Sequence, residues 1–381
     1  MIERGDHTLG RRAGRHLVRL RPLVALKSKT GELDALCRLP ESATGPTAVV
    51  DLLDSVTAER SGRLLGPLVR AAVRLALRGT PLWVDAHRLA GSGSLARQPG
   101  GPLGFLDKRV EAAVEDEYGL FAATFTALIP VVADTASERE LSEVSQLLEH
   151  RPRAVVVRVR QVDAPLLDVR RRLRGIARTA GGEAARLHAI VDLGFVDTVR
   201  QARVDQVSRL SAMLVDLLGP DSTTLLAGSI PAVRTEFATT VRDRLEVTLW
   251  QEVASRVTEL HYGDYGVVHP VPPRTGEPGP RNINPYLYYT IPGRTVALRR
   301  RLARDEDNKV IKGAAIAAFN DLAEELVTRS EFAGKDYSWG DRELTNCGRG
   351  GTRTAGTVPR WVAIATSHHL EHLTRHPGEG I

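Results

Sequence analysis

Cysteine, aromatic residues and long apolar runs are all scarce in this chain of 381 residues. Its two cysteines, Cys37 and Cys347, are too far apart for the short spacings of metal or redox motifs, so we expect a reduced, cytoplasmic protein. Aromatic residues make up only 5% of the chain, and the core must therefore consist mainly of Val, Leu, Ala and Ile. No stretch approaches the roughly 20 apolar residues of a membrane span, and we expect neither a span nor an export signal.

Several motifs that identify a cofactor or a reaction are also missing. The sequence contains no P-loop, no glycine-rich dinucleotide fingerprint after a strand and no G-x-S-x-G nucleophile elbow. It therefore assigns no cofactor.

The net charge of +6 is concentrated at the start of the chain. Residues 1–21 carry six arginines against Glu3 and Asp6, a net charge of +4, so the remaining 360 residues contribute only +2. This division predicts a basic, disordered arm over residues 1–20, with contact to nucleic acid as the alternative. The nearly neutral body lacks the charge of a protein that binds along a phosphate backbone.

Eight short apolar runs alternate with segments of helical periodicity. The runs are 23–29, 48–55, 81–87, 126–134, 154–160, 187–194, 223–229 and 257–266. Buried strands that alternate with helices are typical of a closed parallel barrel. The sequence therefore predicts an α/β protein with a TIM-barrel-like (β/α)8 barrel over residues 21–269.

The composition changes after this predicted barrel. Residues 270–285 hold six prolines, which indicates a loop or hinge. The pattern beyond it predicts one long charged helix over 296–329 as the final barrel helix, and a strand over 361–366. We expect residues 270–381 to form a C-terminal extension that lies over the barrel mouth and completes the site.

Most of the apolar runs end on a charged or hydroxyl residue. In a (β/α)8 barrel the C-terminal ends of the strands hold the working residues. The resulting candidates are Lys27, Lys29, Asp51, Asp85, Arg158, Asp192, Ser229 and Asp264.

Cations among these residues predict an anion site. Lys27 and Lys29 are two residues apart and share a strand face. Arg158 and Arg160 also share a face, and one of them could clamp a phosphate or carboxylate with two hydrogen bonds, with internal salt bridges of the barrel as the alternative. Glu32 follows in the same K-S-K-T-G-E motif, and we include it among the ligand-binding residues. The alternative is that the lysines are solvated where the strand leaves the sheet.

The carboxylates predict acid/base chemistry beside those cations. Burying a lone carboxylate is costly unless it is paired, so Asp85, Asp192 and Asp264 should face the cations. We predict that these three residues, with His368, orient the ligand or act as catalytic acids and bases. The alternative is a set of structural salt bridges that fills the barrel mouth.

Two polar motifs near the C-terminus supply the remaining candidates. S-W-G-D ends in Asp341, and S-H-H contains His368 and His369. We expect Asp341 and His369 to complete the ligand site from the extension. His368 and His372 lie four residues apart, but no glutamate directly follows the first histidine as in zinc proteases, and we assign no metal.

Six segments together resemble the phage beta protein family of satellite phages, prophages and bacterial anti-phage cassettes. The resemblance runs from about residue 20 to residue 372. Its motifs are R-P-L-V-A-L-K-S-K-T-G-E-L-D-A-L (21–36), W-V-D-A (83–86), H-Y-G-D-Y-G (261–266), Y-Y-T (288–290), S-W-G-D (338–341) and W-V-A-I-A-T-S-H-H (361–369). This chain departs from the family pattern at Asp51 and Asp54, where a glutamate is expected, and at Tyr288, where an arginine is expected.

The resemblance implies a role in phage defence, in cassettes where a beta protein accompanies a toxic partner protein and restrains it. It leaves the chemistry open, catalysis included. Two main functions follow from the residues and the resemblance together, and a metabolic barrel enzyme unrelated to defence is a weaker third alternative. The first is a defence protein whose barrel mouth binds an anionic ligand, a nucleotide or a nucleic-acid end. The second is a non-catalytic, antitoxin-like protein that binds the toxic partner.

Overall fold

The computed structural model describes residues 21–40, 45–59, 62–89, 91, 93–119, 124–180, 186–233, 235–271, 283–348, 356–378 and 381. The predicted arm over residues 1–20 lies outside these described residues, as does the proline-rich segment 272–282.

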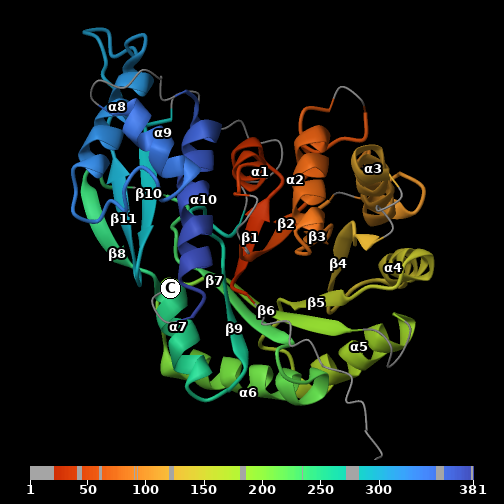
Figure 1. The fold of residues 1–381 in the computed structure, drawn as a ribbon. Helices are drawn as coiled ribbons and strands as arrows, with labels where there is room; N and C mark the ends of the chain where they lie inside the picture. Colours follow the sequence, from red (N-terminus) through yellow and green to blue (C-terminus); the bar gives the residue numbers. More distant parts are fainter. Residues whose placement is uncertain are drawn as a thin grey trace, which may run out of the picture.

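Eight parallel strands close into a barrel in chain order, and the last of them pairs with the first (Figure 1). The strands are β1 (Leu23–Lys27), β2 (Thr47–Asp51), β3 (Leu82–Asp85), β4 (Leu128–Ala133), β5 (Val155–Val159), β6 (Leu187–Phe195), β7 (Thr223–Gly228) and β9 (Leu260–Asp264). Each overlaps one of the eight apolar runs, so the predicted (β/α)8 barrel is confirmed.

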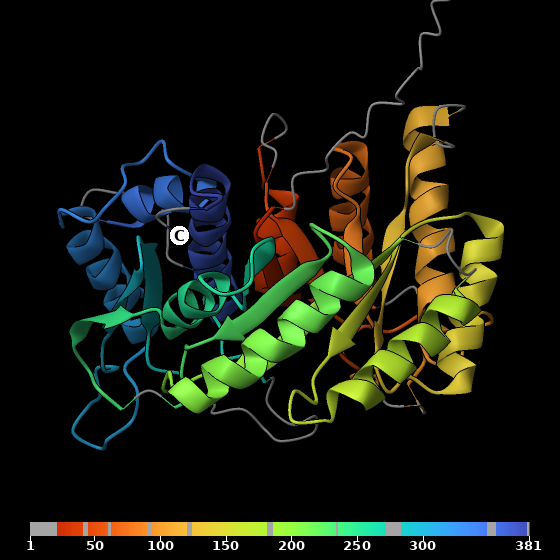
Figure 2. The ribbon, with the colours of Figure 1, turned by 90° about the horizontal axis from the view of Figure 1, so that it is seen from below.

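Seven helices cover the outside of the barrel (Figure 2). They are α1 (Thr30–Cys37), α2 (Leu65–Leu77), α3 (Gly101–Tyr118), α4 (Glu138–His150), α5 (Leu166–Thr179), α6 (Gln201–Leu218) and α7 (Leu245–Ala254). The sequence gives α4 a complete capping box, in which Ser137 and Glu140 each accept from the other's backbone N–H.

Successive strand residues point to opposite faces of the barrel, and two separate clusters record this alternation. Leu23 and Ala25 of β1 belong to the cluster inside the barrel, whereas Val24 and Leu26 pack outward in the cluster under the helices. Each strand is therefore buried on both faces, which explains why the runs are continuously apolar.

A second layer contains a three-stranded antiparallel sheet in the order β10-β11-β8. Its elements are β8 (Thr239–Asp243), β10 (Tyr286–Ile291), β11 (Arg294–Arg299), α8 (Ala314–Val327), α9 (Trp339–Cys347) and α10 (Val358–Arg375). These elements bury their own core, which includes Tyr289, Phe319 and Trp361. The predicted single helix over 296–329 is wrong, because β11 and α8 occupy that range. The strand predicted over 361–366 is also wrong, because these residues belong to α10.

Helix α10 joins the two layers. It packs against α1 on one side and β10 on the other (Figures 1 and 2). Two glycines permit close helix contacts: a Cβ at Gly31 of α1 would collide with the carbonyl oxygen of Pro359, and one at Gly340 of α9 with that of Ile364. Leu370 of α10 belongs to the same apolar cluster as Val24 and Leu26. Helix α10 therefore packs on the flank of the barrel beside α1, and its His369 bonds to Asp264 of β9.

The second layer lies along the flank of the barrel, whereas we expected residues 270–381 over its mouth (Figure 1). Among the described residues, the loop after β9 reaches the mouth. There the main-chain carbonyl of His269 accepts a hydrogen bond from Lys27, and its ring packs on Phe195 at the end of β6, with centroids 5.1 Å apart.

Candidate functional site

Arg158, on β5, lies at the centre of the barrel mouth and is fully buried. Its Nη1 donates to Asp51 Oδ1 at 2.5 Å and to Asp85 Oδ2 at 2.8 Å, and its Nε donates to Asp192 Oδ2 at 2.9 Å. Nη2 donates to the hydroxyl of Tyr265 at 2.8 Å. Three carboxylates and one hydroxyl therefore engage all three nitrogens of this guanidinium and use four of its five N–H donors.

The strand register explains this convergence. Inward-facing residues at the ends of β2, β3, β5 and β6 meet in one layer at the barrel axis. Pairing of Asp51 with Asp85 across β2 and β3 sets two of the carboxylates side by side. Two like charges so close need a shared cation, and Arg158 supplies it.

Two more arginines, Arg88 and Arg160, pair with Asp51 and Asp85. Arg88 Nε lies 3.2 Å from Asp51 Oδ2, and Arg160 Nη2 lies 2.5 Å from Asp85 Oδ2. Burial alone would raise the pKa of Asp85, but the charges of Arg158 and then Arg160 hold it below its usual value. Asp85 is therefore a stable carboxylate at neutral pH and does not act as a proton donor.

Tyr265 completes the layer from the residue after β9. Its hydroxyl donates to Asp192 Oδ1 at 2.6 Å while it accepts from Arg158. Burial and the nearby Asp192 raise the pKa of this phenol well above its usual value. The hydroxyl therefore stays neutral and fixes the orientation of Asp192.

Unpaired donors remain at the rim of this layer. Arg160 Nη1 is buried without a hydrogen-bond partner in the described chain, and its Nε is 3.6 Å from Asp192 Oδ2, too far for a hydrogen bond. The side chain of Arg160 is 22% exposed, although these two nitrogens are buried. Buried donors without partners are costly, which marks Arg160 as a position where an anion would be stabilised.

Lys27 lies inside the barrel beside this layer. Its ammonium donates to the main-chain carbonyl of His269 at 2.8 Å and lies 5.9 Å from the centre of the Tyr265 ring. Burial lowers the pKa of Lys27, although Glu32 and Asp51 oppose the shift. No carboxylate oxygen among the described residues lies within 4 Å of its ammonium. Lys27 is thus a second cation available to an anion.

The other two residues of the K-S-K-T-G-E motif do not line the barrel interior. Strand β1 ends at Lys27, and Lys29 is exposed at the start of α1. Glu32 is buried in α1, where its carboxylate accepts from the backbone N–H of Lys27 at 2.9 Å. Burial raises the pKa of Glu32, partly offset by Lys27. Glu32 therefore positions the end of β1.

Asp264 lies apart from the Arg158 layer, on the outer face of β9. It has the parity of Tyr262, which faces outward, and it bonds to Arg244 at 2.6 Å and to His369 of α10 at 3.0 Å. Burial would raise the pKa of Asp264, but His369 and Arg244 hold it well below its usual value. His369 Nδ1 in turn lies 2.9 Å from Thr290 Oγ1 on β10. This chain of contacts ties the barrel to the second layer.

His368 and Asp341 lie further from the barrel interior. His368 Nδ1 is 3.0 Å from Asp341 Oδ2, and its Nε2 is 2.8 Å from the carbonyl oxygen of Thr290. The ring of His368 stacks on Tyr289, with centroids 3.7 Å apart. Both ring nitrogens are thus engaged inside the second layer.

The structure therefore divides the predicted site into two groups. Lys27, Asp85, Arg158 and Asp192 meet at the barrel mouth, while Asp264, His368, His369 and Asp341 form a buried network between the layers. Sequence reasoning did not select Arg88, Tyr265 or Arg244. The sequence could have indicated Tyr265, because it directly follows Asp264 in H-Y-G-D-Y-G and successive strand residues point to opposite faces of the barrel.

Within the described residues, no group of three or more His, Cys, Asp or Glu side chains is arranged to hold a metal ion. None of the described helices combines the length and the apolar character that crossing a membrane requires.

Comparison with known proteins gives a family match and distant fold matches. The model of the family described as Beta protein matches residues 22–375. None of the curated proteins matches the sequence. Among solved structures, a 3-dehydroquinate dehydratase from Geobacillus kaustophilus HTA426 is 13% identical with a TM-score of 0.32, over 64% of this chain and 81% of that one. A putative lyase/mutase from Burkholderia cenocepacia J2315 is also 13% identical with a TM-score of 0.31, over 65% and 77%.

Proposed function

The chain belongs to the Beta protein family, and we propose that it is a phage-defence protein. We further propose that its barrel mouth binds an anionic ligand, a nucleotide or a nucleic-acid end. The observation that carries the ligand proposal is that Nε and Nη1 of Arg160 have no hydrogen-bond partner in the described chain. Lys27 adds a second basic group at the same end of the barrel. Arg158 has a different role, because four of its five N–H donors are already used. It holds the carboxylates in place below the ligand.

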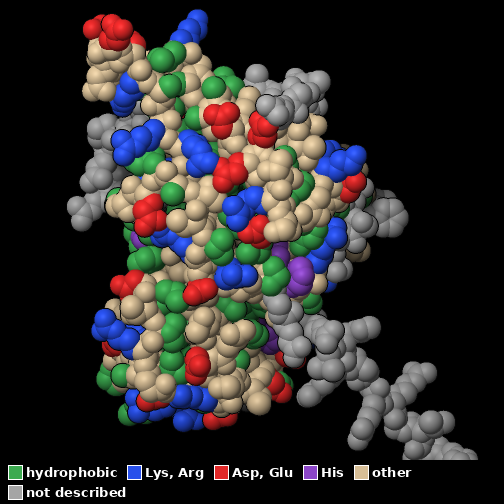
Figure 3. All heavy atoms as spheres, turned by 90° about the vertical axis from the view of Figure 1, so that its left-hand side faces the viewer, with side chains coloured by type: hydrophobic (Ala, Val, Ile, Leu, Met, Phe, Trp, Pro, Cys, Tyr) green, Lys and Arg blue, Asp and Glu red, His purple; other side chains and the backbone are tan. Residues whose placement is uncertain are grey.

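The charge distribution elsewhere supports the mouth as the binding position. On the face formed by β8, β11 and α8, acidic and basic side chains are interspersed among the described residues (Figure 3). Such a mixed surface does not concentrate anions. The mouth also contains both signs of charge, but low exposure there limits the screening of Lys27 and Arg160 by solvent.

The test is binding of inorganic phosphate and of nucleoside monophosphates, measured by isothermal titration calorimetry. Arg160→Met should weaken binding by roughly tenfold or more, because a hydrogen bond to a charged group contributes about 1.5–3 kcal/mol. Arg171→Met is the matched control, since Arg171 is exposed on α5 and pairs only with Asp168 in the described chain. In cells, Arg160→Met should abolish protection against phage at normal protein levels. Absence of phosphate and nucleotide binding by the unmodified protein would refute the proposal.

Exposed apolar residues at the same end of the barrel favour the second function, restraint of a toxic partner protein. Leu167 is 77% exposed at the start of α5, and Val233 is 74% exposed in the loop after β7. Both follow the C-terminal end of a barrel strand, and exposed apolar side chains that cluster often mark protein interfaces. Leu167→Ser with Val233→Ser should release a bound partner in a pull-down and leave phosphate binding unchanged. Loss of the partner with Arg160→Met alone would instead place the contact at the anion site.

A further inference from the structure

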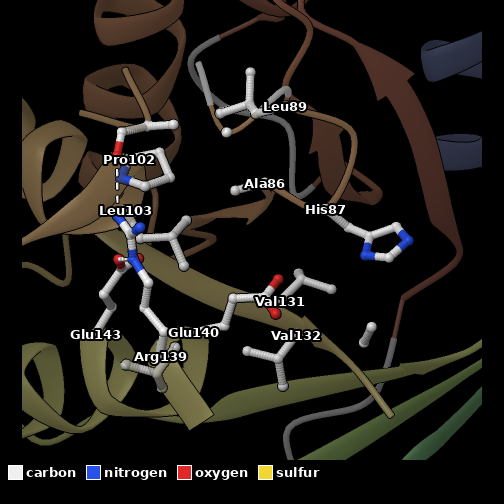
Figure 4. Close-up of a pocket in the computed structure, with 14 residues that line it drawn as sticks. Ala86, His87, Leu89, Pro102, Leu103, Val131, Val132, Arg139, Glu140 and Glu143 are labelled. Carbon is white, nitrogen blue, oxygen red and sulfur yellow. Dashed lines mark hydrogen bonds and ion pairs between the residues drawn. The ribbon is translucent and has the colours of Figure 1, made fainter. Parts of the chain in front are cut away.

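Residues 85–89 contribute to the barrel mouth and to a separate pocket, which Ala86, His87 and Leu89 help to line (Figure 4). Asp85 and Arg88 face the mouth, where they bond to the layer around Arg158. Ala86 and Leu89 line the pocket, and a tight turn joins them through a 3.0 Å bond from Leu89 N–H to the carbonyl of Ala86. One short segment thus contributes to both spaces.

The pocket is small and mainly apolar. Its volume is about 210 Å³, below the roughly 300–1,000 Å³ of pockets that enclose a whole drug-sized ligand. The apolar lining residues are Ala86, Leu89, Ala96, Pro102, Leu103, Val131, Val132, Ala133 and Val144. A space of this size and lining suits one flat ring that belongs to a larger molecule.

Carboxylates at the edge of the pocket disfavour an anion there. Glu143 accepts from Arg139 at 3.0 Å, and its carboxylate occupies the position that a Cβ of Gly101 would take at the start of α3. The helix N-terminus, which attracts negative charge, already has its anion in Glu143. Gly101 has φ +69°, which also favours glycine. Arg139, Glu140 and Glu143 all line the pocket, and their charges sum to −1, so the edge offers acceptor oxygens without a net positive charge for a phosphate.

We propose that this pocket binds the heterocyclic base of a nucleotide whose phosphate is held at Arg160 and Lys27. The inference rests on the proposed anion site and specifies its ligand as a mononucleotide or a terminal nucleotide. Arg160 bonds to Asp85 at the mouth, and the next residue in the chain, Ala86, lines the pocket, so the cationic site and the apolar pocket are neighbours. A neighbouring apolar ring site and cationic site match the two ends of one nucleotide, and exocyclic amino groups of the base meet the carboxylate edge.

The experiment compares inorganic phosphate, AMP, CMP and adenosine on the full chain by calorimetry. AMP or CMP should bind at least tenfold more tightly than phosphate, because the base adds apolar burial. Ala86→Phe fills the pocket from its wall and should reduce nucleotide affinity to that of phosphate. Ala317→Phe is the matched control, since Ala317 is exposed on α8 in the second layer. Thermal unfolding of both variants checks that they are folded.

Three results separate the two proposals. Phosphate binding that Ala86→Phe leaves intact, with loss of the nucleotide advantage, supports the base pocket. Equal affinity for phosphate and both nucleotides, or full nucleotide affinity in Ala86→Phe, overturns the base pocket but not the anion site. No binding of phosphate or any nucleotide to the unmodified protein overturns the anion site itself.

Discussion

Replacement of Arg158 by methionine tests whether this residue supports the barrel or holds a ligand. Methionine keeps much of the side-chain volume but leaves Asp51, Asp85 and Asp192 without their shared cation. Removal of one partner of a buried ion pair typically costs about 3–5 kcal/mol. The remaining pairs with Arg88 and Arg160 keep the expected loss within that range and below the sum of three separate pairs.

This loss converts into a measurable change in melting temperature. With about 2.1 cal/mol/K of unfolding entropy per residue, a 381-residue chain has roughly 0.8 kcal/mol/K. A loss of about 3–5 kcal/mol then lowers Tm by roughly 4–6 °C. Differential scanning calorimetry measures this change, and Arg171→Met, which breaks an exposed pair on α5, should cost no more than about 0.5 kcal/mol.

The pH dependence gives the decisive check on Arg158. In the unmodified protein the pKa of Asp85 is below its usual value, so this carboxylate stabilises the fold above about pH 4 and loses that effect as pH falls. Without Arg158, burial should raise the pKa of Asp85, and its protonation should relieve the repulsion. The stability difference should therefore shrink as pH falls from 7 towards 4. A loss below about 1 kcal/mol, or one that does not change with pH, would refute the structural role of Arg158.

Two further changes test the packing and titration of the second layer. Gly340→Ala should lower the free energy of unfolding by about 1–3 kcal/mol, because its Cβ meets the backbone of α10. The control Gly175→Ala, where α5 leaves open space for a Cβ, should raise it by up to about 1 kcal/mol. Urea unfolding measures both, and equal effects would contradict the close contact at Gly340. Burial and then the charge of Arg244 lower the pKa of His372 to about 2. Below pH 6.5 the unfolded chain therefore binds a proton at this histidine that the folded chain does not bind. The free energy of unfolding then falls by up to about 1.4 kcal/mol per pH unit. His372→Gln should therefore lose less stability than the unmodified protein between pH 6.5 and 4.5, and parallel pH profiles would show that His372 is not held neutral.

The barrel could be predicted from sequence because each strand is buried on both faces. Continuous apolar runs of the right length, separated by helical periodicity, give that signal directly. The antiparallel sheet β10-β11-β8 gives a much weaker signal in the sequence. Strand β8 reads T-T-V-R-D and is partly exposed, so neither burial nor alternation distinguishes it. The run 361–366 was misassigned because α10 is buried on two sides, and a short apolar run alone does not distinguish a buried helix from a strand.

The candidate site could be predicted only in part for a related reason. Polar strand ends located Asp85, Arg158 and Asp192 correctly in the chain, but which face of a strand points inward depends on the barrel register. Asp264 and Tyr265 are neighbours, yet one bonds outward to His369 and the other inward to Arg158. A strand buried on both faces carries no alternation that would reveal this difference.

Helix α10 has a consequence for the order in which the chain can fold during synthesis. The eighth barrel strand ends at Asp264, but α10, which packs against α1 and bonds to Asp264, begins only at Val358. A nascent chain in which all eight strands have left the ribosome therefore still lacks this contact. The flank of the barrel beside α1 and β9 is completed only after β10, β11, α8 and α9 have been synthesised.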